Sequence, residues 1–536
     1  MGAAALTLPA LKARLELSRA KHPSLAGHAR IARRIAALVP GYAYRSDRIF
    51  RSDGAPDDIE ARRRAGFERL SALFHGRFAY TLALTAQAKE SISDLQFTSA
   101  YRVPFQYSAY VRDRLPVGAF WESSSGNTLT DLDGNQLYDL GGSYGLNVFG
   151  YDFYKSCMAE GATRAAALGP VLGAYHPAVA DNVKRLCQIS GMDEVSFHMS
   201  GTEAVMQAVR LARYHTRRSH LVRFCGAYHG WWEDVQPGVG NPAPVRDTYT
   251  LKDMDEDSLR VLSKRRDIAC VLVNPLQALH PNRSAPGDGS LVDSGRSAHF
   301  DRAAYGEWLQ KLRRVCTERG IVLIFDEILV GFRLAPGGAQ EYFGVLADMV
   351  TYGKTVAGGL PVGVLCGRRQ FMQRFNEQRP ADICFARGTF NAHPYVMASM
   401  QVFLERMQGL AHRYEGLEER WNARAKHLNR LLREANVPVQ VANLSTIFTV
   451  SYTRPSRYNW MLQYYLRAEG LALSWVGTGR MIFTLDCSEA DFEQIGRRFV
   501  AACRAMEADG WWWSDPALTN KAIRRGILRE MIAQKL

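Results

Sequence analysis

Small and polar residues follow five short apolar runs in the middle of the chain. Among them are a lysine, a carboxylate, an aromatic ring and a Ser-Gly-Thr turn. A lysine can attack a carbonyl, a carboxylate can hold a protonated ring nitrogen, and a small-residue turn can hold a phosphate. In chain order these residues are Ser200, Gly201, Thr202, Tyr228, His229, Asn274, Gln277, Asp326 and Lys354.

The turn from Ser200 to Thr202 precedes an apolar stripe at helical spacing that begins at Ala204. The first turn of a helix leaves backbone N–H groups free, and the helix dipole places positive charge there. The turn is therefore a candidate phosphate site. A plain Ser or Thr helix cap is the alternative, and the turn does not follow the nucleotide-binding pattern GxxxxGK[ST].

Asp326 ends the most apolar run, VLIFD, and a carboxylate at a buried strand end needs a cationic or hydrogen-bonding partner. Lys354 lies among small residues after another run, where burial would lower its pKa and make it a nucleophile. Taken singly, Asp326 could be a helix cap or a structural ion pair, Lys354 a surface lysine, and Tyr228 a core aromatic.

In combination, these side chains are the ones that pyridoxal phosphate and its amino form, pyridoxamine phosphate, require. The lysine forms the Schiff base, and the carboxylate keeps the pyridine nitrogen protonated so that the ring acts as an electron sink. The aromatic ring stacks on the cofactor. The sequence therefore predicts a site for this cofactor, with Lys354, Asp326 and Tyr228 as its catalytic residues.

The apolar runs that must position these residues are typical of strands buried on both faces of a mainly parallel sheet. In that architecture ligands bind at the carboxyl ends of the strands, where the polar residues come. The runs cover residues 195–199, 221–225, 268–273, 321–325 and 349–352. We therefore predict an α/β fold.

Apolar residues at helical spacing among Arg and Lys, at 8–40 and 56–74, predict an N-terminal α-helical extension. In the last third, helices over 402–436 and 489–508 flank a β-rich stretch over 438–487. The predicted divisions are the extension at 1–95, an N-terminal segment of a small domain at 96–165, a cofactor-binding large domain at 166–400, a C-terminal small domain at 401–510 and a basic tail at 511–536.

The chain resembles the class III, fold-type I aminotransferases that depend on pyridoxal phosphate, on the branch of glutamate-1-semialdehyde 2,1-aminomutase. The resemblance covers roughly residues 120–505. It implies a large domain around a mainly parallel sheet and a small α+β domain. The motifs that carry it are LTDLDGNQLYDLGGSYG (129–145), SGTEAVMQAVRLAR (200–213), FCGAYHG (224–230), FDEILVGFR (325–333), GGAQEYFGV (337–345), YGKTVAGGLPVG (352–363) and ARGTFNAHP (386–394).

The resemblance implies a role for each matching residue of the ring site. Lys354 would be the Schiff-base lysine and the proton shuttle at the substrate carbon. Asp326 would pair with the pyridinium nitrogen, and Tyr228 would stack on the ring, with His229 beside it in the cofactor site.

The phosphate site is implied in the same way. Ser200, Gly201 and Thr202 would hold the phosphate, and Thr389 would reach the phosphate of the partner subunit. That role implies a homodimer with the active site at its interface.

Several positions depart from the family pattern. Asn274 stands where most class III enzymes have Glu before Pro, and Leu279 stands where some transaminases have a donor-gating Glu and the aminomutases an Asn. Leu329 replaces a Gln that contacts the ring oxygen in many transaminases. The partner of the ring hydroxyl is therefore open, with Asn274 and Gln277 as candidates.

Three residues are candidates for binding the substrate. Arg480 falls near the position where transaminases bind a substrate carboxylate, although the aminomutases have a Glu nearby. Trp231 directly follows the Tyr-His-Gly motif and suggests an apolar lining of the approach, with plain packing as the alternative. Tyr144, in the Gly-Ser-Tyr-Gly motif, is the third.

Composition narrows the class of protein. The chain has 536 residues with 47% hydrophobic and 22% charged residues, which excludes disordered and fibrous classes. Nine cysteines without a CxxC pair favour free thiols in a reducing compartment and argue against a structural zinc or other metal site. With neither a secretory signal nor an apolar run of spanning length, we expect a cytoplasmic protein.

The net charge of +14 is concentrated at the two ends: residues 1–80 carry 15 Lys and Arg against 7 Asp and Glu. Solvated helix faces are the simplest explanation. An acidic carrier protein or an anionic membrane could also bind there, whereas the chain shows no signature of a nucleic-acid-binding motif.

We therefore predict a pyridoxal-phosphate-dependent aminotransferase that moves an amino group to or from a small-molecule aldehyde or ketone through Lys354. A carrier-bound substrate would also fit. The first alternative is intramolecular amino transfer of the glutamate-1-semialdehyde 2,1-aminomutase type. Other reactions of the cofactor, such as epimerisation or decarboxylation, and a catalytically silent scaffold of the same fold are further alternatives.

Overall fold

The computed structural model describes residues 8–23, 27–236, 240, 243, 246–279, 282, 298–474 and 479–534. The chain divides into two compact units. The first unit holds residues 1–37, 153–286 and 300–415, and the second holds 38–152, 287–299 and 416–536. The five-part division predicted from the sequence is finer than this grouping and stays a prediction.

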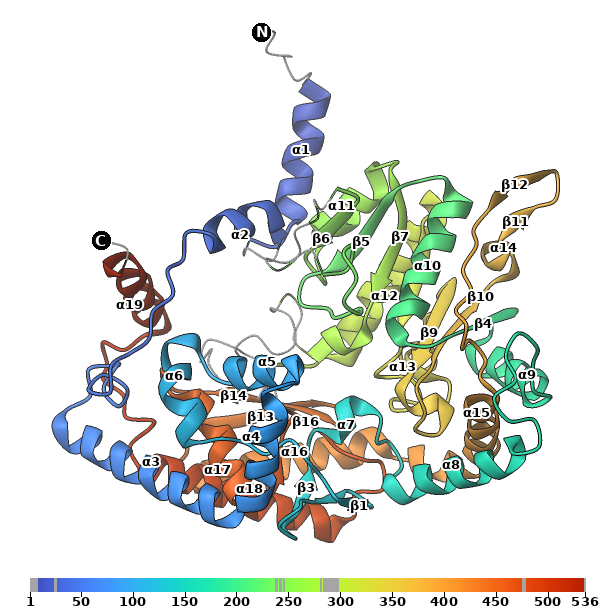
Figure 1. Cartoon of the computed structure of the whole chain (residues 1–536). Helices are drawn as coiled ribbons and strands as arrows, with labels where there is room; N and C mark the ends of the chain where they lie inside the picture. Colours follow the sequence, from blue (N-terminus) through green and yellow to red (C-terminus); the bar gives the residue numbers. More distant parts are fainter. Residues whose placement is uncertain are drawn as a thin grey trace. The chain divides into compact units, whose positions relative to one another are not determined.

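A seven-stranded sheet forms the centre of the first unit, in the order β4-β10-β9-β8-β7-β5-β6 (Figure 1). Strand β10 runs antiparallel to both neighbours, whereas β9, β8, β7, β5 and β6 pair in parallel. Every residue of β7, β8 and β9 is buried, as expected for strands covered on both faces. The strands are β4 (Glu194–His198), β5 (His220–Phe224), β6 (Thr248–Leu251), β7 (Ile268–Val273), β8 (Val322–Asp326), β9 (Met349–Gly353) and β10 (Gly363–Gly367).

Helix α10 (Gly201–Thr216) packs against five strands, from β4 and β10 to β7, because its apolar stripe is wholly buried. Ala204, Ala208 and Leu211 of that stripe are fully buried. The other elements of the first unit are α1 (Leu8–Ala20), α2 (Ala29–Ala36), most of α8 (Tyr151–Ala165), α9 (Ala178–Ser190), α11 (Glu256–Lys264), η2 (Pro275–Leu279), α12 (Arg302–Arg319), α13 (Gly338–Phe343), η3 (Lys354–Ala357), α14 (Arg369–Met372), β11 (Phe375–Asn376), β12 (Arg379–Ile383), α15 (Pro394–Met407) and η4 (Gln408–Tyr414).

The second unit combines helices with two small sheets, of order β1-β2-β3-β15 and β13-β14-β16. Its strands are β1 (Ser123–Ser125), β2 (Thr128–Thr130), β3 (Gln136–Asp139), β13 (Val439–Leu444), β14 (Ile447–Tyr452), β15 (Leu471–Ala472) and β16 (Arg480–Ile482). Its helices are α3 (Asp57–Arg77), α4 (Ala79–Lys89), α5 (Ser93–Tyr101), α6 (Phe105–Arg114), α7 (Gly142–Gly145), α16 (Leu417–Glu434), η5 (Asn459–Met461), α17 (Leu462–Ala468), α18 (Glu489–Ala508) and α19 (Asn520–Ala533).

The predicted extension is tied to the C-terminal part of the second unit by the buried side chain of Arg63 on α3. Its guanidinium donates two hydrogen bonds of 2.8 Å to the carboxylate of Asp53, and both side chains are fully buried. Arg63 Nε also donates to the carbonyl of Gly510 at 2.9 Å, and the guanidinium lies 4.4 Å from the ring centroid of Tyr458. Residues 38–95 are therefore an integral part of this unit.

The predicted α/β fold is confirmed, and each of the five apolar runs forms a strand. Strands β6 and β10 were not predicted. β10 is the antiparallel member of the sheet, and its small residues, GVLCG, carry little strand signal. Among the described residues, no helix is long and apolar enough to cross a bilayer.

Replacing Asp53 with Ala should lower the free energy of unfolding by about 3–5 kcal/mol, because it leaves a buried guanidinium without its counter-charge. Unfolding in urea, followed by circular dichroism, measures the loss. The matched control is Asp47→Ala, which breaks the solvent-exposed pair with Arg45 and should leave the unfolding midpoint nearly unchanged. Equal losses in the two variants would contradict this account of Arg63.

Candidate active site

The candidate site lies at the carboxyl ends of the central strands of the first unit. Strands β8 and β9 are parallel, and Asp326 at the end of β8 is paired in register with Thr351 of β9. Lys354 comes three residues later, at the start of η3, with a left-handed φ of +47°. The register therefore brings Asp326 and Lys354 to the same edge of the sheet.

Asp326 is only 3% exposed, and hydrogen bonds hold its carboxylate in place. Oδ2 lies 2.8 Å from Nδ1 of His229, and Oδ1 accepts from the backbone N–H of Ile328 at 3.2 Å and from Oγ1 of Thr351 at 3.5 Å. A carboxylate accepts, so the proton of a neutral His229 ring sits on Nδ1. Burial lowers the pKa of His229, which favours that neutral ring although Asp326 opposes the shift.

Burial lowers the pKa of the Lys354 ammonium to about 8. The negative charge of Asp326 raises this pKa and the positive charge of Arg333 lowers it, but burial has the largest effect. A substantial fraction of the amine is therefore neutral, and able to attack a carbonyl, near neutral pH.

The N-terminus of α10 forms the other wall of the candidate site. Ser200 is its N-cap, and Oγ accepts from the N–H of Glu203 at 3.3 Å, while Oε2 of Glu203 accepts from the N–H of Met199 at 2.9 Å. This reciprocal cap uses the Ser200 hydroxyl as an acceptor, which leaves its O–H free to donate, and the N–H groups of Gly201 and Thr202 lie outside the hydrogen bonds of the helix.

Two glycines lie where the N-terminus of α10 packs closely against its neighbours. A Cβ at Gly201 would come within 2.5 Å of Cδ1 of Ile328, and one at Gly230 would come within 2.5 Å of Oγ1 of Thr202. Gly230 also has a φ of +94°, which disfavours side chains. Small residues are therefore required where α10 meets the loops after β5 and β8.

The Tyr228 ring is half exposed, at 50%, next to the fully buried His229. Its backbone carbonyl accepts from the Nδ2 amide of Asn274 at 3.1 Å, and Gln277 Nε2 donates to the carbonyl of Cys225 at 2.7 Å. Both amides thus fix the loop that carries Tyr228. Whether either also meets the ring hydroxyl of a cofactor stays a prediction.

The other predicted residues are exposed in the first unit or belong to the second unit. Trp231 is 72% exposed and Thr389 is also exposed, both in the first unit. Tyr144 and Arg480 belong to the second unit. The substrate roles of Tyr144, Trp231 and Arg480, and the role of Thr389 toward a partner subunit, stay predictions.

The sequence did not reveal the side chains that hold Asp326 in place or act on the pKa of Lys354. Thr351 holds Asp326 from the next strand, and Arg333 is a wholly buried cation close enough to act on Lys354. Glu327 is buried too, and burial raises its pKa to about 8, although it accepts from the N–H groups of Ala339 and Gln340. The motif FDEILVGFR shows charged residues after the strand end, but it does not show which groups these charges act on.

The family model described as aminotransferase class-III matches residues 107–235 and 297–503. Two curated relatives bear the name glutamate-1-semialdehyde 2,1-aminomutase. The one from Alkaliphilus oremlandii is 34% identical over 299 residues, 52% of this chain and 64% of the relative, so the chain spans just under two thirds of its length. The one from Lawsonia intracellularis is 30% identical over 391 residues, 68% of this chain and 84% of the relative.

Solved structures show the same fold. A structure described as a transaminase with PLP bound is 27% identical with a TM-score of 0.62, covering 74% of this chain and 92% of the other. The glutamate-1-semialdehyde aminomutase of Pseudomonas aeruginosa has a TM-score of 0.65 at 18% identity, covering 83% of this chain and 99% of the other.

The residues present fit pyridoxal phosphate. The N–H groups of Gly201 and Thr202 suit its phosphate, and the half-exposed Tyr228 ring suits its pyridine face. His229 Nε2 is buried without a hydrogen-bond partner among the described residues. A buried polar atom next to Asp326 is therefore left without a described protein partner. Lys354 and Asp326 supply the amine and the carboxylate.

The pKa of Lys354 predicts how protein freed of cofactor takes up pyridoxal phosphate. The rate of appearance of the visible cofactor band should rise as the pH passes through about 8, because only the neutral amine attacks. Stopped-flow absorbance between pH 6.5 and 10 measures this profile, and Lys354→Ala should show no such band. A rate that is still rising at pH 10 without levelling off, as the ordinary lysine value of 10.5 requires, would contradict the burial effect.

Replacing Asp326 with Asn should leave cofactor binding largely intact but slow turnover by about 10²- to 10³-fold, because one electrostatic contact to the reacting ring is lost. Absorbance titration measures binding, and the rate of band loss with an amino donor measures turnover. The control is Asp267→Asn, which changes a carboxylate just before β7, at the opposite edge of the same sheet. An Asp326→Asn enzyme as fast as the control would overturn the assigned role.

Proposed function

The chain belongs to the aminotransferase class-III family, and we propose that it is a pyridoxal-phosphate-dependent aminotransferase that moves an amino group to or from an aldehyde or a ketone. The observation that carries this proposal is the meeting of Lys354, with its lowered pKa, and the buried Asp326 at one sheet edge. A protein of the same fold without catalytic activity would not need a buried lysine with a lowered pKa.

When bound, the cofactor supplies the electron sink that weakens bonds at the carbon bearing the amino group. Lys354 Nζ accepts the proton from that carbon and delivers it to another atom, and a pKa near neutrality suits both steps. The Asp326 carboxylate would hold the proton at the ring nitrogen, and its hydrogen bonds with His229 and Thr351 keep the carboxylate in place. Tyr228 orients the ring.

The choice of amino donor is proposed to differ from that of the donor-gated transaminases. Leu279, which stands at the position of their gating Glu, is fully buried at the end of η2. An apolar side chain there offers no carboxylate to pair with an arginine. Arg480 is the proposed partner of a substrate carboxylate.

We propose a homodimer in which Thr389 reaches the cofactor phosphate of the partner subunit. Thr389 is exposed, and so are the nearby aromatic rings of Phe385 and Phe390. Exposed aromatic side chains around one polar residue suit a protein interface. An acidic carrier protein is a further proposed partner, supported only by the positive charge of residues 1–80.

Intramolecular amino transfer is the second candidate, because the relatives of 30–34% identity carry the name glutamate-1-semialdehyde 2,1-aminomutase. The two reactions share the same lysine and carboxylate. They differ in whether an external amino donor is consumed.

Adding amino donors one at a time to the holoenzyme should convert the visible cofactor band to a near-ultraviolet band with at least one donor. The keto product should form in equal amount. Lys354→Ala should lose turnover by many orders of magnitude, because it removes the nucleophile and the general base together. The matched control Lys155→Ala changes a lysine of α8 and should react as the parent does.

The result separates the two candidates. Formation of 5-aminolevulinate from glutamate-1-semialdehyde without any added donor would replace transamination by the aminomutase reaction. An unimpaired Lys354→Ala enzyme would overturn both.

A further inference from the structure

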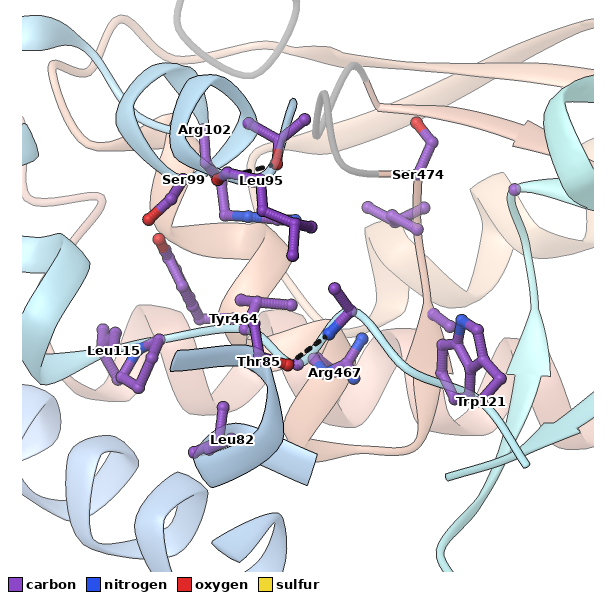
Figure 2. Close-up of a pocket in the computed structure, with 18 of the residues that line it drawn as sticks. Leu82, Thr85, Leu95, Ser99, Arg102, Leu115, Trp121, Tyr464, Arg467 and Ser474 are labelled. Atoms are coloured by element: carbon purple, nitrogen blue, oxygen red, sulfur yellow. Dashed lines mark hydrogen bonds between the residues drawn. The ribbon is translucent and has the colours of Figure 1, made fainter. Parts of the chain in front are cut away.

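A cavity of about 450 Å³ lies within the second unit, between α4, α5 and the loop after β15 (Figure 2). Helices α4 and α5 end before residue 107, where the match to the family model begins. Part of the cavity wall is therefore built by residues outside that match. None of the cofactor-site residues of the first unit lines it.

Arg467 of α17 is a buried cation at this cavity. It is 6% exposed, and its Nε and Nη2 atoms are buried without any hydrogen-bond partner in the described part of the chain. Burial lowers the pKa of Arg467 to about 10, and the nearby charges of Arg102 and Arg77 lower it further, whereas Asp131 raises it. An arginine still holds its proton at neutral pH, so this charge is incompletely compensated.

Asp131 does not satisfy the guanidinium. Its Oδ1 accepts from the backbone N–H groups of Asp133 and Asn135, at 3.0 and 2.8 Å, and both carboxylate oxygens accept from Nδ2 of Asn135. Arg467 instead lies 5.3 Å from the ring of Trp121 and 5.2 Å from that of Phe78, which contact it through their faces.

Arg102, at the end of α5, brings a second guanidinium to the same cavity. Its one hydrogen bond among the described side chains is a long one, from Nη1 to Oε1 of Gln463 at 3.4 Å. Burial lowers the pKa of Arg102 as well. Lys89 and Arg112 also line the cavity, and Asp139, its one acidic lining residue, is already held by Tyr151 and by backbone N–H groups. The cavity is therefore strongly positive.

The remaining wall is apolar and aromatic. Leu82, Leu95, Leu115 and the Trp121 ring line the cavity together with the two arginines (Figure 2). Two arginines that line one cavity suit an anionic head, and the apolar wall suits a hydrocarbon or aromatic body. The volume matches a small molecule and excludes a folded partner.

We propose that this cavity binds a small organic anion, with a carboxylate or phosphate head held by Arg467 and Arg102 and an apolar body held against Trp121 and the leucines. Tyr144, the candidate substrate residue of the second unit, also lines this cavity. The proposal concerns binding alone and holds whether or not the proposed reaction takes place. It accounts for a buried arginine whose Nε and Nη2 have no hydrogen-bond partner among the described residues.

Isothermal titration of the holoenzyme with 3-phenylpropanoate and with phenyl phosphate tests the proposal. At least one of the two should bind, and the one with the higher affinity shows whether a carboxylate or a phosphate is the preferred head group. The neutral amide, 3-phenylpropanamide, should bind at least about tenfold more weakly, since it lacks the charge that the arginines require. Equal binding of amide and acid, or binding of neither anion, would overturn the proposal, as would inorganic phosphate binding as tightly as phenyl phosphate.

Arg467→Gln separates ligand binding from structural support. The variant should bind the preferred anion at least about tenfold more weakly. Its melting temperature without ligand should not fall, because an uncompensated buried charge has been removed. Arg497→Gln removes the same charge from an exposed position on α18 and should bind as the parent does. A lower melting temperature with unchanged affinity would show a purely structural role and contradict the proposal.

Arg102→Gln provides an independent variant if Arg467→Gln does not fold. It should also weaken the anion by about tenfold while leaving the affinity for the neutral amide unchanged. Unchanged anion affinity in this variant would overturn the assignment of the head group to the two arginines.

Discussion

Burial of opposite charges at adjacent strand ends is the constraint on which the first unit depends. Asp326 and Lys354 are both largely removed from water, and each is less costly to bury because the other is near. Their meeting requires β8 and β9 to be parallel and in the observed register, since a slip of one residue would turn the carboxylate to the other face. Thr351, on the neighbouring strand β9, and His229, in the loop after β5, then fix the carboxylate.

The sheet could be predicted because its strands are buried on both faces. IACVLV and VLIF are apolar throughout, which favours buried strands, and the polar residue that follows each one is marked as a candidate. Antiparallel β10 escaped prediction because GVLCG begins and ends in glycine. Its pairing with both β4 and β9 is a long-range choice that no local pattern records.

The residue types of the candidate site could be predicted from the sequence. The roles of the individual residues could be predicted less well. Lys354, Asp326 and Tyr228 could be named from motif and position. The sequence left open whether Ser200 caps a helix or holds a phosphate. The structure shows that its hydroxyl oxygen caps the helix by accepting from Glu203 N–H, and the phosphate roles of Ser200, Gly201 and Thr202 stay predictions. Arg333 was not foreseen, because its effect on Lys354 depends on how the chain folds back after β8.

The N-terminal helices show a second use of buried arginine. Arg63 is wholly satisfied by Asp53 and backbone carbonyls, and it joins residues 38–95 to the C-terminal segment. Arg467, in the same unit, lines a cavity, and its Nε and Nη2 have no hydrogen-bond partner in the part of the chain that the structure describes. Arg63 therefore supports the fold, whereas Arg467 is the residue that we propose to bind an anion.

The central claim is that Lys354 is the lysine that binds the cofactor. Reduction of the holoenzyme with borohydride, followed by proteolysis and mass spectrometry, locates a lysine-bound pyridoxyl group directly. The account predicts the label on the peptide that contains Lys354, in stoichiometric amount. A label on another lysine, or none on a protein that retains its visible band, would contradict it.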